Sequence, residues 1–263
     1  MKRGSAALVS CALVLSFGAC GGDGDEDSDD SIVISAASSL TEPLEAYGET
    51  TETEEQYSFA GSDDLAAQIR KGAPVDVFAS ANTSLPVALF DEGLVEEPEI
   101  FISNQLVLAV PKNGVLLSET LPDTAPFRLL PDVSDIDVVI AAEGVPVGDY
   151  TREVLSKLSD GDEGSILSRV RSEEPDVKSI VGKLVTGAAD AGFVYASDVN
   201  AAGGELIAIE LPKEVDPIVT YAVAVVADTE NPEGAQEYID SLVDGEAHEF
   251  LLDAEFLEPP QEK

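Results

Sequence analysis

The segment QYSFAGSDDLAAQIRKGAPVDVFAS, Gln56–Ser80, decides the fold class because it reads as a strand, a helix and a second strand in succession. Its helix is marked at both ends. Ser62 stands at the expected N-cap, acidic residues follow in the first turn, basic residues fill the last turn, and Gly72 stops the helix. The flanking apolar runs predict strands at Gln56–Phe59 and Val75–Ala79. This succession indicates an α/β protein.

The same alternation continues in both directions along the chain, without an internal repeat. A chain of 263 residues that is 44% hydrophobic can bury the core of one large domain or of two lobes. Further strands are predicted at Ile32–Ala36, Gln105–Val110, Asp137–Ala141, Ala191–Tyr195, Leu206–Ile209 and Ile218–Ala227. Helices are predicted to begin near Leu40, Asp63, Leu85, Asp149, Val177 and Pro232.

The N-terminus MKRGSAALVSCALVLSFGAC has a basic start, an apolar run and small residues before Cys20. This pattern is typical of a secretory signal peptide, residues 1–19, which is too short to span a membrane. The Gly18-Ala19-Cys20 ending resembles the lipobox of bacterial lipoproteins and predicts Cys20 as the lipid-modified first residue of the mature chain. An ordinary cleaved signal with an incidental cysteine is the alternative.

The stretch GGDGDEDSDD follows the cysteine and contains no apolar residue. Residues 20–30 are therefore expected to be a lipidated cysteine and a solvated, disordered tether. Cys11 lies in the segment that is removed, so the mature chain would retain Cys20 alone and could form no intramolecular disulfide.

The chain is strongly acidic, with 52 Asp and Glu against 14 Lys and Arg and a net charge of −38. No basic stripe is present, which argues against nucleic acid as a partner. An acidic surplus along the whole chain fits a surface adapted to high salt. An unusually acidic protein from an ordinary habitat fits equally well.

Residues for catalysis are scarce. Nucleophilic catalysis by a serine needs a base, and His248 is the only histidine, in a helix-like C-terminal segment. No G-x-S-x-G elbow, zinc-ligand spacing or phosphate-binding loop occurs. We therefore expect His248 to be a surface or packing residue and the protein not to be an enzyme.

Features for anion binding are more abundant. SLTE, Ser39–Glu42, reads as a capping box, and Ser62 begins the helix quoted first. Val147 stands just ahead of one predicted helix, and Val177 follows Asp176, the expected cap of another. Tyr195 ends a strand. Amides at helix starts and neutral hydroxyls suit an oxyanion, and parallel strand ends open onto one crevice.

Six segments of the chain together form a distinctive pattern: SAASSLTEPL, FAGSDDLAAQIRKGAPVDVFASA, NQLVLAVPK, GVPVGDYTREVL, GFVYASDV and YAVAVV. In this order and spacing, from Ile32 to Phe256, the chain resembles the molybdate-binding proteins of ABC importers. The combined motifs are far more specific than any one alone. The resemblance implies a two-lobe, type II periplasmic-binding-protein-like fold, each lobe a mixed sheet flanked by helices, with the ligand in the cleft between lobes.

The resemblance also implies the site and its partners. The oxyanion contacts would be the hydroxyls and amides of Ser39 and Ser62, the amides of Val147 and Val177, and the hydroxyl of Tyr195. Lobe I would comprise residues 31–106 and 221–263, and lobe II residues 107–220. The expected protein is a monomer without cofactor, held by lipid to the outer face of the cell membrane, which delivers molybdate and also tungstate to a permease and its ATPase.

Some alternatives remain open at this point. Asp63, Asp64, Asp149 and Asp176 flank the expected site, and a related group of binders uses carboxylates to complete six-coordinate metal. A receptor for sulfate or another tetrahedral oxyanion is the nearest rival. A secreted serine hydrolase using Ser39 or Ser62, and a calcium-binding surface adhesin, are rivals of other classes.

Overall fold

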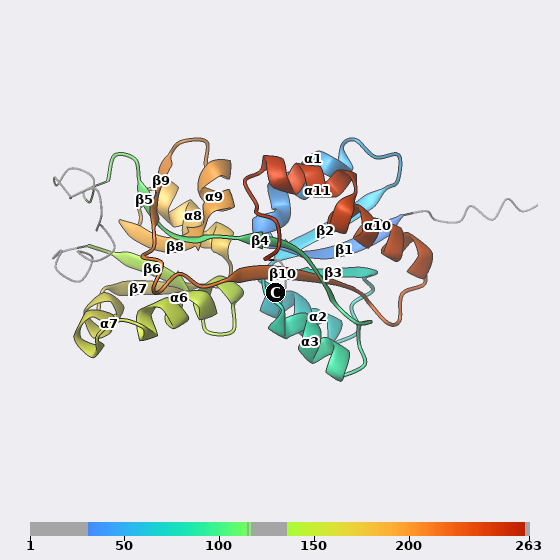
Figure 1. The fold of residues 1–263 in the computed structure, drawn as a ribbon, viewed down its shortest axis with the longest axis horizontal. Coiled ribbons are helices and arrows are strands. Elements are labelled where there is room, and N and C mark those ends of the chain that lie inside the picture. The colour runs from blue at the N-terminus through green and yellow to red at the C-terminus, as the bar shows by residue number, and fades with distance from the viewer. Residues whose placement is uncertain (1–30, 115, 117–135, 261–263) are drawn as a thin grey trace, which may run out of the picture.

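The computed structural model describes residues 31–114, 116 and 136–260 and contains two five-stranded mixed sheets, each flanked by helices (Figure 1). The sheets lie side by side along the long axis of the molecule. The signal peptide, Cys20 and the tether lie outside the described residues, so their predictions are not addressed by the fold. None of the described helices combines the length and the apolar character that crossing a membrane requires.

The first sheet has the strand order β2-β1-β3-β10-β4. Strands β1, β2 and β3 are parallel, whereas β10 runs antiparallel to both β3 and β4. Helices α2 and α3 pack on one face, and α1, α10 and α11 cover the other. The elements are β1 (Ile32–Ala37), η1 (Ser38–Leu40), α1 (Thr41–Gly48), β2 (Glu55–Ala60), α2 (Ser62–Ile69), β3 (Val77–Ser80), α3 (Ser84–Asp91), β4 (Glu99–Asn104), β10 (Val219–Val225), α10 (Pro232–Asp244) and α11 (Glu246–Asp253).

The second sheet has the order β7-β6-β8-β5-β9. Strands β6, β7 and β8 are parallel, and β5 is antiparallel to β8 and β9. Helix α6, with α7 beside it, covers one face, and α8 and α9 cover the other. The elements are β5 (Leu106–Pro111), β6 (Val138–Ala141), α6 (Pro146–Ser156), α7 (Asp160–Leu167), β7 (Val170–Glu174), α8 (Val177–Val185), β8 (Ala191–Tyr195), α9 (Ala196–Ala201) and β9 (Leu206–Glu210).

The chain crosses between the sheets from β4 to β5 and again from β9 to β10. The two crossings lie together, because β10 pairs with β4 at Val219 and Asn104. We call the first sheet with its helices lobe I and the second sheet with its helices lobe II.

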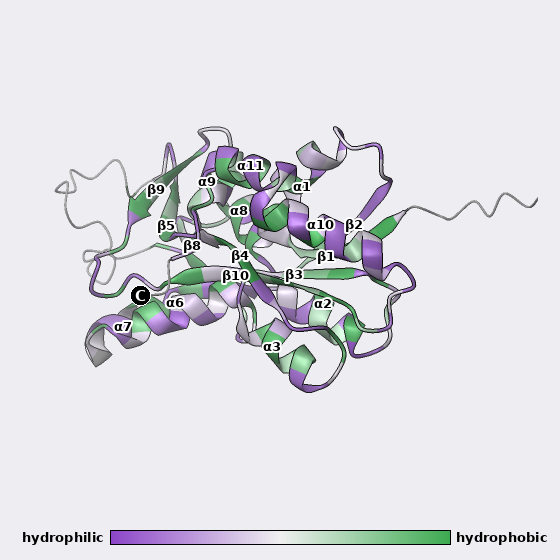
Figure 2. Cartoon of the chain, turned by 45° about the vertical axis from the view of Figure 1, so that its right-hand side comes forward, coloured by the Kyte–Doolittle hydropathy of each residue, from purple (hydrophilic) through white to green (hydrophobic). Residues whose placement is uncertain are grey.

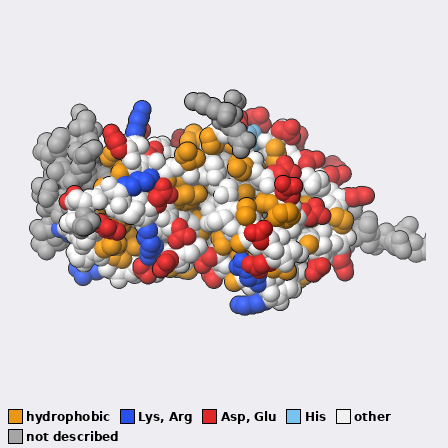
Figure 3. Space-filling model, turned by 60° about the horizontal axis from the view of Figure 1, so that its bottom comes forward, with side chains coloured by type: hydrophobic (Ala, Val, Ile, Leu, Met, Phe, Trp, Pro, Cys, Tyr) orange, Lys and Arg blue, Asp and Glu red, His pale blue; other side chains and the backbone are white. Residues whose placement is uncertain are grey.

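The inner strands of both sheets are mostly hydrophobic, as Figure 2 shows. In β6 and β8 every residue is buried. Strands covered by helices on both faces have no solvent-exposed face, so hydrophobic and polar residues do not alternate along them. On the outside, acidic side chains are spread over the face that carries α2, α3, α6 and α7 (Figure 3).

The eight predicted strands and the six predicted helices are all present. The helix start expected near Asp149 is wrong by three residues, because Pro146 occupies the first helical position, where its missing N–H costs nothing. Strands β4 and β7 and helices α7 and α9 were not predicted. Strand β7, VRSEE, is largely charged, and α9 begins directly where β8 ends, without a separating loop.

Candidate functional site

The carboxyl ends of the parallel strands in both lobes carry the residues that the sequence singles out. In lobe I, β1 leads into η1 and β2 into α2. In lobe II, β6 leads into α6, β7 into α8, and β8 ends on Tyr195. Each junction therefore brings the amides of a helical start to one end of a sheet.

A small cavity lies where these junctions of the two lobes meet, and all five predicted contact residues line it. No lining side chain is charged. The lining residues are Ala37, Ser38, Ser39, Ala60, Gly61, Ser62 and Ala81 from lobe I, and Val145, Pro146, Val147, Val177 and Tyr195 from lobe II.

Ser39 lies in the buried η1 turn that joins β1 to α1. Its predicted role in a capping box is wrong, because the N-cap of α1 is Leu40, and no side chain caps this helix. The Ser39 Oγ instead shares a hydrogen bond of 2.9 Å with the Tyr221 hydroxyl. The serine hydroxyl is thus held by the crossing strand β10 at the edge of the cavity.

Ser62 is the first residue of α2, and Gly61 is the N-cap. The predicted capping role of Ser62 is therefore also wrong. Its Oγ accepts a hydrogen bond of 3.1 Å from the backbone amide of Ala81, just beyond β3. An accepting Oγ keeps its own O–H proton available as a donor.

Lobe II offers backbone amides from two helices. Val177 is the first residue of α8, and the predicted cap Asp176 is confirmed, since its carboxylate accepts from the amide of Ser179 at 2.8 Å. Val147 lies inside the first turn of α6 rather than ahead of it, which corrects the prediction. Both valines still belong to the helical starts whose amides find no intrahelical carbonyl.

Tyr195 is fully buried, yet its hydroxyl has no hydrogen-bond partner among the described residues. Burial, and secondarily the neighbouring Tyr221, raises the pKa of Tyr195 well above its ordinary value. The group therefore keeps its proton and can act as a donor. A buried polar atom left unpaired costs free energy, which makes this hydroxyl the clearest sign of a ligand.

Sequence reasoning missed the roles of four polar residues that lie next to the lining of the cavity. Tyr221 holds Ser39, and its ring packs edge-on against Tyr195 at 5.9 Å between centroids. The Asp198 Oδ2 accepts from the Tyr195 amide at 3.1 Å, while Lys178 faces Glu42 and Asp198. Tyr221 and Asp198 lie inside quoted motifs, but nothing in a single sequence indicates that they meet.

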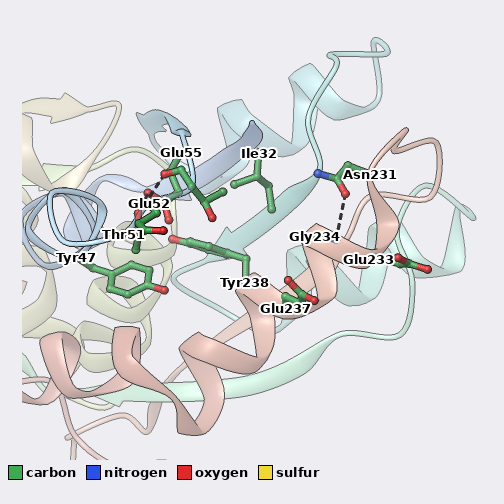
Figure 4. A pocket seen from close by; sticks show the side chains of 11 residues that line it. Ile32, Tyr47, Thr51, Glu52, Glu55, Asn231, Glu233, Gly234, Glu237 and Tyr238 are labelled. Carbon is green, nitrogen blue, oxygen red and sulfur yellow. Dashed lines mark hydrogen bonds between the residues drawn. The ribbon is translucent and has the colours of Figure 1, made fainter. Parts of the chain in front are cut away.

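A larger pocket of about 720 Å³ lies in lobe I between the start of β2, with the loop before it, and α10 (Figure 4). Glu52, Glu55, Glu233 and Glu237 line it, so its field repels an anion. Within the described part of the chain no three acidic, His or Cys side chains are grouped so that they could hold a metal ion. We therefore place the candidate site at the small neutral cavity between the lobes.

His248 is buried in α11, where its Nδ1 lies 2.9 Å from the Leu242 carbonyl oxygen. It does not line the interlobe cavity. The packing role expected for the one histidine of the chain fits this position.

Comparison with known proteins identifies the family. The model of the bacterial extracellular solute-binding proteins matches residues 32–256. The chain belongs to this family. The molybdate-binding protein ModA of Mycobacterium tuberculosis is 31% identical over 263 residues, covering 95% of each chain. A putative ABC transporter substrate-binding lipoprotein of Bacillus subtilis, YvgL, is 28% identical and covers 92% of each.

Among solved structures, a periplasmic molybdate-binding protein of Azotobacter vinelandii superposes with a TM-score of 0.75 at 20% identity. The match covers 87% of this chain and 100% of that one. At this identity the likeness concerns the fold, and it confirms the predicted two-lobe architecture. Membership in a family of solute-binding proteins agrees with the expectation that the chain is not an enzyme.

Proposed function

We propose that this protein is a lipid-anchored extracytoplasmic receptor that captures molybdate, and tungstate as well, for an ABC importer. The observation that carries the proposal is the buried Tyr195 hydroxyl, which lies in a neutral cavity lined by residues of both lobes and has no partner among the residues that the structure describes. The names of the relatives, molybdate-binding proteins among them, support the choice of ligand.

The proposed contacts are the hydroxyls and amides of Ser39 and Ser62, the amides of Val147 and Val177, and the Tyr195 hydroxyl. All are neutral donors, and the helix starts add a partial positive charge. Such a local field can hold a dianion in an acidic protein, because distant surface charges are screened. A ligand that touches both lobes stabilises their closed arrangement, which the permease would recognise.

A donor-only site also predicts selectivity. Molybdate and tungstate carry no proton at neutral pH, whereas hydrogen phosphate would leave its O–H facing an amide, at a cost of about 1–3 kcal/mol. Sulfate carries no such proton, so the site has to discriminate against it by the smaller size of the ion. Its shorter bonds would leave some donors out of reach in a cavity fitted to the larger ions.

The remaining elements of the proposal concern location and organisation. The relative named as a lipoprotein supports lipidation of Cys20, with delivery to a permease and ATPase at the outer face of the membrane. We propose lobe boundaries at residues 31–106 with 221–263 and at 107–220, which lie within two residues of the starts of β5 and β10, a hinge at the two crossings, and a monomeric receptor.

Isothermal titration calorimetry of the purified protein with molybdate, tungstate, sulfate and phosphate tests the proposal. We expect molybdate and tungstate to bind with similar affinity, sulfate well below them, and phosphate at least about tenfold more weakly than molybdate. Tighter binding of sulfate would make the protein a sulfate receptor. Phosphate binding as tightly as molybdate would mean that a nearby carboxylate is a ligand and that the donor-only site is wrong.

A further inference from the structure

Lys178 lies in the first turn of α8, directly after Val177, and its ammonium group faces two carboxylates. Its Nζ donates a hydrogen bond to Glu42 Oε2 at 2.5 Å and lies 3.6 Å from Asp198 Oδ1. Glu42 belongs to α1 in lobe I, while Asp198 belongs to α9 in lobe II. Among the ion pairs formed by the described residues, the pair of Lys178 with Glu42 is the one that joins the two lobes.

Each partner of Lys178 adjoins a segment of the candidate site. Glu42 lies in the first turn of α1, immediately after the η1 turn that contains Ser39. Asp198 accepts a hydrogen bond from the backbone amide of Tyr195. Lys178 itself neighbours Val177 in the sequence. One ammonium group therefore contacts a carboxylate next to the Ser39 segment and a carboxylate that binds the Tyr195 amide.

The two carboxylates differ in burial, and this difference determines how much free energy the loss of the Lys178 charge would cost. The Asp198 side chain is completely buried, and its Oδ1 has no hydrogen-bond partner within the described part of the chain, whereas the Glu42 side chain is half-exposed. A buried charge without a counter-charge is expensive, and like charges repel strongly in such surroundings. Without Lys178, closing the lobes would bring the Glu42 carboxylate towards that of Asp198 with no cation between them.

We propose that Lys178 is a positioning residue that joins the closed lobes and neutralises the meeting carboxylates of Glu42 and Asp198, thereby slowing release of the bound oxyanion. The proposal rests on the proposed function, since it assigns to Lys178 a role in holding that ligand. In this proposal Lys178 affects ligand release through Glu42 and Asp198 and does not itself contact the ligand.

Three variants of the full-length protein test this role. Lys178→Gln removes the cation and is expected to weaken molybdate binding about 5- to 50-fold, a coupling typical of linked conformational changes. Most of the loss should appear as faster dissociation in stopped-flow measurements. Lys157→Gln is the matched control, because it makes the same charge change at the end of α6, where Lys157 pairs with Glu153 and donates to the Val215 carbonyl oxygen at 3.4 Å, both outside the candidate site. Its affinity should stay within about twofold of wild type.

The double variant Glu42→Gln/Lys178→Gln supplies a readout that a purely structural role would not give. Removing the Glu42 charge relieves the repulsion left by Lys178→Gln, so the double variant should bind more tightly than the single one. Small-angle X-ray scattering of the free protein gives a readout that needs no ligand. We expect a larger radius of gyration for Lys178→Gln than for wild type or Lys157→Gln.

The outcomes separate the two proposals. If wild type binds none of the four oxyanions, the proposed function fails, and the scattering comparison alone decides the role of Lys178. If wild type binds molybdate but Lys178→Gln binds it equally well, the inference is overturned while the proposed function stands. An equal radius of gyration in all variants, together with equal affinities or an absence of binding, also overturns it.

Discussion

The hydroxyl of Tyr195 is buried, lines the interlobe cavity and has no hydrogen-bond partner among the described residues. Its ring is held by Tyr221 and by the buried end of β8, and its amide is held by Asp198. The amide hydrogen bond and the ring contact hold the residue, so the hydroxyl is presented in a fixed position. Such preorganisation lowers the entropic cost of binding.

Tyr195→Phe is therefore expected to separate affinity from stability. The ring still packs, and the lost hydroxyl had no partner among the described residues, so the melting temperature should stay unchanged or rise slightly. Oxyanion affinity should fall by about 1.5–3 kcal/mol, the range for a hydrogen bond to a charged group. Calorimetry and thermal melting measure the two quantities.

Tyr221→Phe serves as the contrast. It removes the partner of the Ser39 Oγ, so it should lower the melting temperature as well as the affinity. Unchanged affinity in Tyr195→Phe would show that the Tyr195 hydroxyl lies outside the binding site.

The positions of the site residues could be predicted from the sequence, but the hydrogen-bond partners of their side chains could not. The positions of Ser39, Ser62, Val147, Val177 and Tyr195 could be predicted, because helix starts and strand ends leave local signals. The partners could not. The two serine hydroxyls were expected to cap their own helices, but they bond to Tyr221 and Ala81, which are distant in the chain. Local spacing carries no information on such contacts.

At the scale of elements, the first turn of α6 is fixed by close packing against the end of β6. A Cβ atom added at Gly148 would lie 2.2 Å from the Ala142 carbonyl oxygen and 2.7 Å from that of Ala141. Both are backbone atoms and cannot rotate away. Glycine at this position lets the helix start approach the strand end and sets the place of the Val147 amide.

Gly148→Ala is expected to lower the free energy of unfolding by about 1–3 kcal/mol, the usual cost of overpacking, and to weaken oxyanion binding. Chemical denaturation and calorimetry measure the two effects. Gly182→Ala in α8 is the control, since a Cβ there meets nothing within 4 Å. That variant should gain up to about 1 kcal/mol from helix propensity and bind normally. A Gly148→Ala variant as stable as wild type would contradict the packing argument.

The start of α9 contains a buried carboxylate with a distinct pH signature. Burial is the main cause that raises the pKa of Asp198 to about 6, against a smaller opposite effect of Lys178. The folded state thus binds a proton that the unfolded chain releases near pH 4. The contribution of Asp198 to stability is full below that pH and is lost as the pH rises to about 6.

Asp198→Asn should remove this pH dependence, because an amide still accepts from the Tyr195 N–H and carries no charge. We expect the variant to be more stable than wild type at pH 7.5, by up to roughly 3 kcal/mol, with the difference vanishing near pH 4. Denaturation at a series of pH values measures it. A difference in stability that is independent of pH would argue against a raised pKa.

At the scale of the whole molecule, two lobes meet at an uncharged cavity within a chain of net charge −38. The topology that brings them together depends on β10, which returns from lobe II to lie between β3 and β4. The order of apolar runs predicts alternating strands and helices, but it does not state which strands are neighbours. The resemblance to a known family supplied that arrangement.

The acidic surplus leads to a prediction for the whole molecule in salt. Acidic side chains are spread over a face that spans both lobes, and their mutual repulsion opposes the compact state (Figure 3). Sodium chloride shortens the screening length from about 10 Å at 0.1 M to about 3 Å at 1 M. If the surface is adapted to high salt, the melting temperature should rise by at least about 3 °C between dilute buffer and 2 M sodium chloride, since 1 kcal/mol corresponds to roughly 2–4 °C in a chain of this size.

Chloride is the suitable anion, because sulfate could occupy the oxyanion site and stabilise the protein by binding. A melting temperature that does not move with sodium chloride would favour an acidic protein of an ordinary habitat, whose surface charges lie far enough apart to need no screening.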